Sequence, residues 1–316
     1  MRSTILVVTA FAVGCIQPLE DSYSPEHSRS TSAKIFRGEY PIKATATVGM
    51  VADLVRNIGG SKVVVDCLMG PGVDPHRYKT TPGDVRRLRS ADVIFFSGLH
   101  LEGKMSEVLH RIGAYKPALA AAEAIDASLL MREEEGDATD PHVWFDVSLW
   151  RKAAEAVAAK LCEFDPSNAE EYRANAAAYV LKMDELHRYA KKSMEAVPKE
   201  RRVLVTAHDA FRYFGKAYGI EVRGIQGIST DDEAGVKHVN DLVSFLIERK
   251  VKAVFVETSV SDRNLRAVLE GCAARGWNVE LGAELFSDAL GDEGTDDGTY
   301  LGMVRHNVDA IAMALR

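Results

Sequence analysis

The amino-acid sequence predicts an α/β protein of two lobes, each with a parallel sheet flanked by helices, joined by one long backbone helix. From Pro41 onward, short strand-like runs alternate with runs of helical periodicity, which indicates βα units and parallel sheets. Between residues 146 and 202 the strand signals stop, and they resume afterwards. A chain of 316 residues is also long enough for two compact domains.

The expected strands fall into two groups on either side of this strand-free stretch. In the first half we expect strands at Lys43–Val48, Val63–Met69 and Asp92–Ser97, with helices at Val51–Ile58, Pro82–Ser90 and Glu102–Ile112. In the second half we expect strands at Val203–Ala207, Glu221–Ile225, Ala253–Glu257 and Asn278–Gly282.

The middle of the chain predicts two consecutive helices. The first covers Val147–Phe164 and is interrupted by Asp165-Pro166. Ser167 and Glu170 then form a Ser-x-x-Glu capping-box pattern for a second helix, which can run to about Val197 before Pro198 stops it. Residues expected on its buried face recur every three or four positions: Tyr172, Ala176, Tyr179, Met183, Leu186, Ala190 and Met194. About 30 residues at 1.5 Å each span roughly 45 Å.

These boundaries define five segments. Residues 1–15 form a signal segment and 16–40 a flexible tether, which is polar and serine-rich. The first lobe covers 41–165, the linking helix 166–198 and the second lobe 199–316.

The N-terminus predicts export from the cytoplasm. Arg2 precedes an almost wholly apolar run, Ile5–Gly14, which is too short to span a bilayer but fits an export signal. The run ends in Ala12-Val13-Gly14-Cys15, which resembles a bacterial lipoprotein box. We therefore expect a periplasmic or extracytoplasmic protein anchored to the membrane through lipidated Cys15; a plain secretory signal with an incidental cysteine is the alternative.

Charge and cysteine spacing exclude other classes of protein. A formal net charge of −7 argues against general nucleic-acid binding, which calls for a basic surface. Cys67, Cys162 and Cys272 match neither a zinc ribbon nor a CxxC motif, so we expect buried thiols. No phosphate-binding glycine-rich loop is present, so any ATPase needed for transport must be another chain.

One tripeptide occurs twice, as Asp74-Pro75-His76 and as Asp140-Pro141-His142. Proline fixes its own φ and restrains the residue before it. Each histidine is therefore expected on a stiff loop, which suits a metal ligand whose direction is set before the ion arrives.

Two further residues follow predicted strands of the second half. His208 comes directly after Val203–Ala207, and Asp288 lies beyond the last strand. Ligands of open α/β sheets bind beyond the carboxyl ends of the strands, and His76 obeys the same rule. Together with His142 these residues make a set of three imidazoles and one carboxylate, which suits zinc and also manganese or iron. Four protein ligands tend to close a site, and no His-Glu-x-x-His motif is present, so metal carriage is favoured over catalysis.

These motifs, with Thr206-Ala207-His208-Asp209-Ala210-Phe211, Gly227-Ile228-Ser229-Thr230 and Leu285-Phe286-Ser287-Asp288, resemble the TroA-like metal-binding solute-receptor family of ABC transporters. The resemblance extends over nearly all of Pro41–Arg316. It implies that one divalent metal ion is held between two lobes by His76, His142, His208 and Asp288. It also implies delivery to an inner-membrane ABC permease served by a separate ATPase chain, with the receptor acting as a monomer and not as an enzyme.

The resemblance leaves zinc and manganese open, with iron possible. Manganese-specific relatives often have glutamate where this chain has His208, whereas zinc-specific relatives often carry a long histidine-rich loop. The corresponding stretch here, Met131–Asp140, is acidic and lacks histidine. We expect Glu257 to hold the second ring nitrogen of a ligand, with Asp146 and Asp209 as other candidates, while His100 is a weaker candidate for the cleft. Rival functions are a surface adhesin lipoprotein and a zinc hydrolase.

Overall fold

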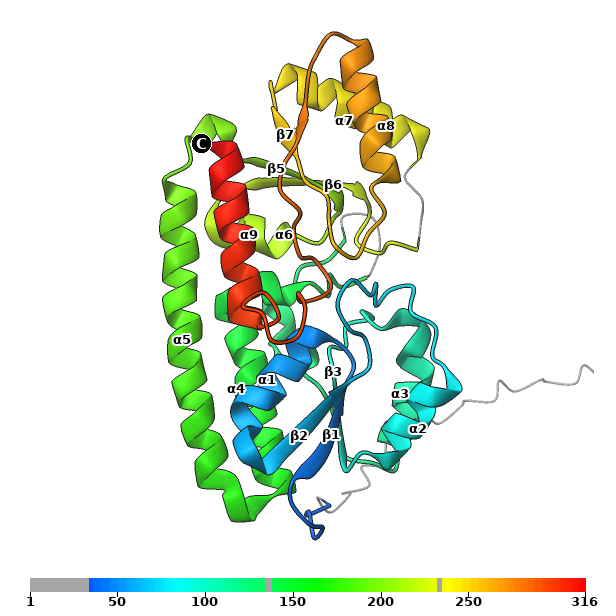
Figure 1. Cartoon of the computed structure of the whole chain (residues 1–316), viewed down its shortest axis with the longest axis vertical. Coiled ribbons are helices and arrows are strands. Elements are labelled where there is room, and N and C mark those ends of the chain that lie inside the picture. The colour runs from blue at the N-terminus through cyan, green and yellow to red at the C-terminus, as the bar shows by residue number, and fades with distance from the viewer. Residues whose placement is uncertain (1–33, 134–137, 232–234) are drawn as a thin grey trace, which may run out of the picture. The chain divides into compact units, whose positions relative to one another are not determined.

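The computed structural model describes residues 34–133, 138–231 and 235–316 (Figure 1). Within them, the chain from residue 34 onward belongs to one compact unit. The expected signal segment, Cys15 and residues 16–33 of the expected tether lie outside the described residues. None of the helices in the described ranges combines the length and apolar character needed to cross a bilayer.

Residues 34–40, which the sequence placed in the tether, contact the first half of the chain. The Phe36 amide donates to the Phe164 carbonyl at 2.6 Å, and the two rings lie 5.6 Å apart. The Tyr40 hydroxyl donates to Asp165 at 2.9 Å. Phe36 and Tyr40 therefore contact the first half of the chain, although most residues of this segment are exposed.

The first sheet contains four parallel strands in the order β2-β1-β3-β4. Its elements are β1 (Ile42–Ala46), α1 (Gly49–Gly59), β2 (Val63–Cys67), α2 (Pro82–Ser90), β3 (Val93–Phe96), α3 (Ser106–Gly113) and β4 (Ala118–Ala120). The three expected strands are confirmed, each slightly shorter than predicted. The edge strand β4 was missed because Ala-Leu-Ala is too short to show alternation, and only its pairing with β3 defines it.

Two long helices follow, α4 (Val147–Phe164) and α5 (Ala169–Glu195), as the sequence predicted. The seven expected apolar positions of α5 are all buried. The predicted capping box is wrong. Pro166 starts a 3-10 turn over Pro166–Asn168, which places Ser167 inside the turn and Asn168 at the N-cap, without a side-chain capping bond.

The second half contains two pairs of parallel strands, β5 (Val203–His208) with β6 (Glu221–Gln226) and β7 (Ala253–Val254) with β8 (Glu280–Leu281). Its helices are α6 (Arg212–Tyr218), α7 (Val236–Glu248), α8 (Arg263–Ala274) and α9 (Tyr300–Leu315). The last two strands are shorter than expected. Single bridges between Thr206 and Phe255, and between Glu257 and Leu285, extend the pairing toward the loops that follow.

Two apolar cores occupy the described ranges. The larger core includes residues of β1, β3, α1, α4, α5 and also α6 and α9 from the second half. The smaller core lies among β5, β6, β7, α7 and α8. The C-terminal helix α9 packs against α5 and α1, so the end of the chain rests on helices that precede the second sheet (Figure 1).

The cysteines differ from the prediction of three buried thiols. Cys272 is buried, but Cys67 and Cys162 are half-buried; all three are free thiols. Cys67 ends β2, an edge strand, so one of its sides is not covered by a neighbouring strand. Partial burial still raises the pKa of the Cys67 thiol to about 11.

Candidate metal centre

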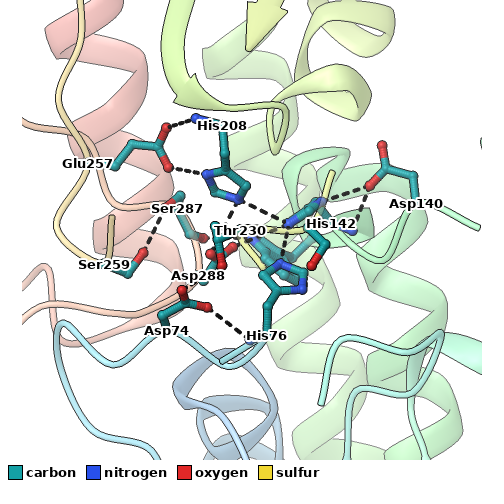
Figure 2. A network of polar contacts seen from close by, with 12 residues as sticks. Asp74, His76, Asp140, His142, His208, Thr230, Glu257, Ser259, Ser287 and Asp288 are labelled. Carbon is teal, nitrogen blue, oxygen red and sulfur yellow. Dashed lines mark hydrogen bonds and ion pairs between the residues drawn. The ribbon is translucent and has the colours of Figure 1, made fainter. Parts of the chain in front are cut away.

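Four buried side chains from distant parts of the chain converge on one point: His76, His142, His208 and Asp288. One candidate ligand atom from each lies within 4.8 Å of the others. Their side chains point toward one another from both halves of the chain (Figure 2). The structure therefore brings together the whole set that the sequence singled out.

The two Asp-Pro-His motifs fold into similar turns. In each, the first oxygen of the aspartate accepts the backbone N–H of the histidine two residues later, at 2.9 Å for His76 and 3.0 Å for His142. The two aspartates differ in the other contact that each one makes. Asp140 also contacts Nδ1 of His142 at 2.8 Å, whereas the other oxygen of Asp74 accepts the Thr230 hydroxyl at 2.6 Å.

His208 is the last residue of β5 and is held by one carboxylate. Glu257, which is 3% exposed, accepts the His208 backbone N–H at 2.9 Å and contacts its Nδ1 at 2.5 Å (Figure 2). Such a partner sets the ring orientation and leaves Nε2 directed at the ion. The expectation for Glu257 is confirmed. Asp146 instead caps α4, and Asp209 pairs with Arg212.

The loop that carries Asp288 is attached to α9. Asn307, a fully buried residue of α9, accepts the Phe286 N–H and donates to the Phe286 carbonyl. The Trp144 indole donates to the Ser287 carbonyl at 3.1 Å. Sequence reasoning missed Asn307, because nothing in the order of residues links a helix-interior asparagine to a loop 21 residues away.

Burial and paired charges oppose each other at this site. Burial lowers the pKa of His76 to about 3. It would also lower the pKa of His142, but the nearby carboxylates of Asp140 and Asp288 outweigh it and raise that pKa to about 9. Burial disfavours charge on Asp288 as well, yet His208 and His142 hold its pKa well below the usual value. The raised pKa of His142 and the lowered pKa of Asp288 have the same cause, the attraction between an imidazolium and a carboxylate that are buried together.

The atoms that face the centre are all potential acceptors. Nε2 of His142 lies 3.3 Å from Nε2 of His76 and 3.4 Å from Nε2 of His208. The two oxygens of Asp288 lie 3.3 Å from Nε2 of His142 and of His208 and have no hydrogen-bond partner within the described ranges. When Nδ1–H of His142 donates to Asp140 and Nδ1–H of His208 donates to Glu257, the Nε2 lone pairs of both rings face the Asp288 carboxylate. A buried cation satisfies all of these groups at once.

The family model "Zinc-uptake complex component A periplasmic" matches residues 45–314. The chain belongs to this family.

Relatives of the zinc-uptake component A family cover most of the chain. It is 48% identical over 275 residues to the "Manganese-binding lipoprotein MntA" of Bacillus subtilis, covering 87% of this chain and 90% of that protein. It is 47% identical over 269 residues to the "Zinc-binding protein TroA" of Treponema pallidum, covering 85% and 87%. The solved structure of the periplasmic zinc-binding protein TroA from Treponema pallidum superposes with a TM-score of 0.85 at 46% identity, covering 88% of this chain and 99% of that one. These matches confirm the resemblance inferred from the motifs, and with it the fold class.

His100, the weaker candidate for the cleft, does not lie among the four converging side chains. This residue is exposed. It has a left-handed backbone, with φ of 63°, in a turn held from inside by Glu102. The carboxylate of that buried residue accepts the N–H groups of Ser97 and Gly98, so hydrogen bonds to the backbone hold this strained turn.

Gly224 on β6 is a second residue that sequence reasoning missed. A Cβ at this position would lie 2.5 Å from the backbone nitrogen of Asp209, directly after His208. We expect Gly224→Ala to force β6 away from the end of β5, lowering stability by about 1–3 kcal/mol and weakening metal binding. Thermal unfolding and metal titration measure both effects. Gly227→Ala is the control, because a Cβ there meets nothing within 4 Å, and equal behaviour of the two variants would contradict the prediction.

Proposed function

We propose that this protein is the extracytoplasmic solute-binding component of an ABC transporter, which captures one divalent transition-metal ion and delivers it to a permease. The ligands are His76, His142, His208 and Asp288. The observation that carries the proposal is the convergence of three Nε2 atoms on a buried carboxylate whose oxygens lack hydrogen-bond partners among the described residues. Membership of a periplasmic zinc-uptake family supports it.

The ion is zinc or manganese, with iron as a further candidate. Two relatives of nearly equal identity, 48% and 47%, are named for manganese and for zinc, so overall identity does not favour either metal. Three imidazoles and one carboxylate hold zinc more tightly than manganese under equal supply. The loading in the cell then follows the metal that is available.

The proposal extends to location and partners. The relative named as a manganese-binding lipoprotein supports an anchor at Cys15, on the extracytoplasmic side of the membrane. The receptor acts as a monomer on a permease with a separate ATPase chain. We propose the lobe boundaries 41–165 and 199–316 and a linking helix within 166–198, for which the long α5 is the support.

A carrier is favoured over a zinc hydrolase, and experiment distinguishes it from an adhesin. A zinc hydrolase needs an open coordination position and a base beside it, whereas all four candidate ligands here are at most 5% exposed. Ester or peptide hydrolysis abolished by a chelator would support the hydrolase. Binding to host matrix that does not depend on metal loading would support the adhesin.

The proposal is tested by elemental analysis of natively isolated protein, followed by zinc–manganese competition. We expect about one transition-metal ion per chain, with zinc displacing manganese at equal concentration. Protein that is isolated without metal and binds neither ion would overturn the proposal.

A further inference from the structure

The two halves of the chain contact each other on both sides of the metal centre, but the kind of contact differs between the His142 side and the His76 side. On the His142 side, α6 is packed directly against the loop that leads to His142. The Tyr213 hydroxyl accepts the Met131 N–H at 2.8 Å and donates to the Asp140 carbonyl at 3.2 Å. The Phe145 and Phe211 rings stack at 4.3 Å. Buried aromatic packing of this kind resists separation of the two halves.

On the His76 side, polar contacts join the halves. The Thr230 hydroxyl donates to Asp74 Oδ2 at 2.6 Å, and Lys104 contacts Asp231 at 2.7 Å. Thr230 is 3% exposed and Asp74 is half-buried, so their hydrogen bond is partly shielded from water, whereas Lys104 and Asp231 are exposed and their ion pair contributes little. The Thr230–Asp74 bond is therefore the stronger of these two contacts.

Asp74 links Thr230 to the candidate ligand His76. While Oδ2 accepts the Thr230 hydroxyl, Oδ1 of the same carboxylate accepts the His76 backbone N–H at 2.9 Å. Among the described residues, no carboxylate holds the ring of His76, unlike the rings of His142 and His208. His76 is also the most exposed of the four candidate ligands, at 5% against 0–1% for the others. Its position therefore depends on the Asp74 turn to a greater degree than that of the other two histidines.

We propose that Thr230 is a positioning residue for metal retention: through Asp74 it holds His76 against the ion, and the ion leaves on this side once the Thr230–Asp74 bond breaks. The inference rests on the proposed function and adds a route and a rate-controlling contact. Opening on the His76 side breaks the part-buried Thr230–Asp74 hydrogen bond and the exposed Lys104–Asp231 ion pair, whereas opening on the His142 side separates stacked rings.

The test measures the rate of metal release to an excess of chelator by stopped flow, on zinc-loaded full-length protein. Thr230→Val keeps the shape of the side chain and removes the hydroxyl. We expect it to release zinc about tenfold faster, since a hydrogen bond to a charged group is worth about that factor or more. Thr230→Ser restores the hydroxyl and should bring the rate back near that of the wild type.

Thr80→Val is the matched control, because the Thr80 hydroxyl is buried without a hydrogen-bond partner in the described structure. It should leave the release rate unchanged. Wild-type release from Thr230→Val, or equal acceleration by Thr230→Val, Thr230→Ser and Thr80→Val, would overturn the inference alone. A wild-type protein that binds neither zinc nor manganese would instead overturn the proposed function.

Discussion

Replacing His208 by alanine should abolish tight, stoichiometric metal binding. The substitution removes one of four donors, leaves the buried Glu257 carboxylate without its imidazole partner and leaves Asp288 with His142 alone. Loss of groups that only support a ligand already weakens metal affinity by about 10–100-fold, so loss of the ligand itself should exceed that range. Metal at about 100 times the wild-type Kd stabilises the native state by about 2.7 kcal/mol, and the variant should lose this gain at the same concentration.

Metal content by mass spectrometry and melting temperature with and without metal measure this prediction. His110→Ala is the control, because His110 is exposed on α3 and belongs to no group of converging ligands. It should keep both the metal and the increase in melting temperature. Unchanged metal content in His208→Ala would remove His208 from the ligand set.

Metal affinity should fall steeply as the pH drops from about 9 to 6. In the metal-free site the pKa of His142 is raised to about 9 and that of His208 is raised well above its usual value, whereas His76, with a pKa of about 3, is already neutral. Metal binding requires neutral imidazole, so the ion displaces protons from His142 and His208. Each displaced proton weakens affinity about tenfold per pH unit below the pKa.

Titration calorimetry in buffers of different ionisation enthalpy measures the released protons, expected to be about one to two per ion near pH 7. Asp140→Asn should reduce this release, because the Asp140 carboxylate helps to raise the pKa of His142.

The stability of the metal-free protein depends on the protonation of the same histidines. Because the pKa of His142 is higher in the folded protein than its ordinary value of 6.5, its protonation stabilises the fold fully below about pH 6.5. This stabilisation is lost as the pH rises through about 9. A metal affinity independent of pH would contradict the expected displacement of protons, and a metal-free stability that does not fall toward pH 9 would contradict the expectation for folding.

Local patterns predicted much of the fold because periodicity and chain-breaking residues act over a few positions. The bounds of α2 and α4 agree with the prediction, since Pro82 and Asp165-Pro166 mark helix ends directly. The sequence did not predict the edge strand β4, and it misplaced the N-cap of α5. The three residues of β4 are defined by their pairing with β3, and a 3-10 turn before α5 shifts its N-cap by one residue.

The same division applies to the metal centre. The amino-acid sequence alone determined which side chains could serve, because Asp-Pro-His and the ends of strands constrain the nearby backbone. Tertiary structure decided what surrounds them: Glu257 on His208, Asn307 under the Asp288 loop, and Thr230 on Asp74. Each of these contacts joins residues 21 to 156 positions apart. Hydrogen bonds over such separations depend on how the sheets and the helices α5 and α9 pack, which no short motif records.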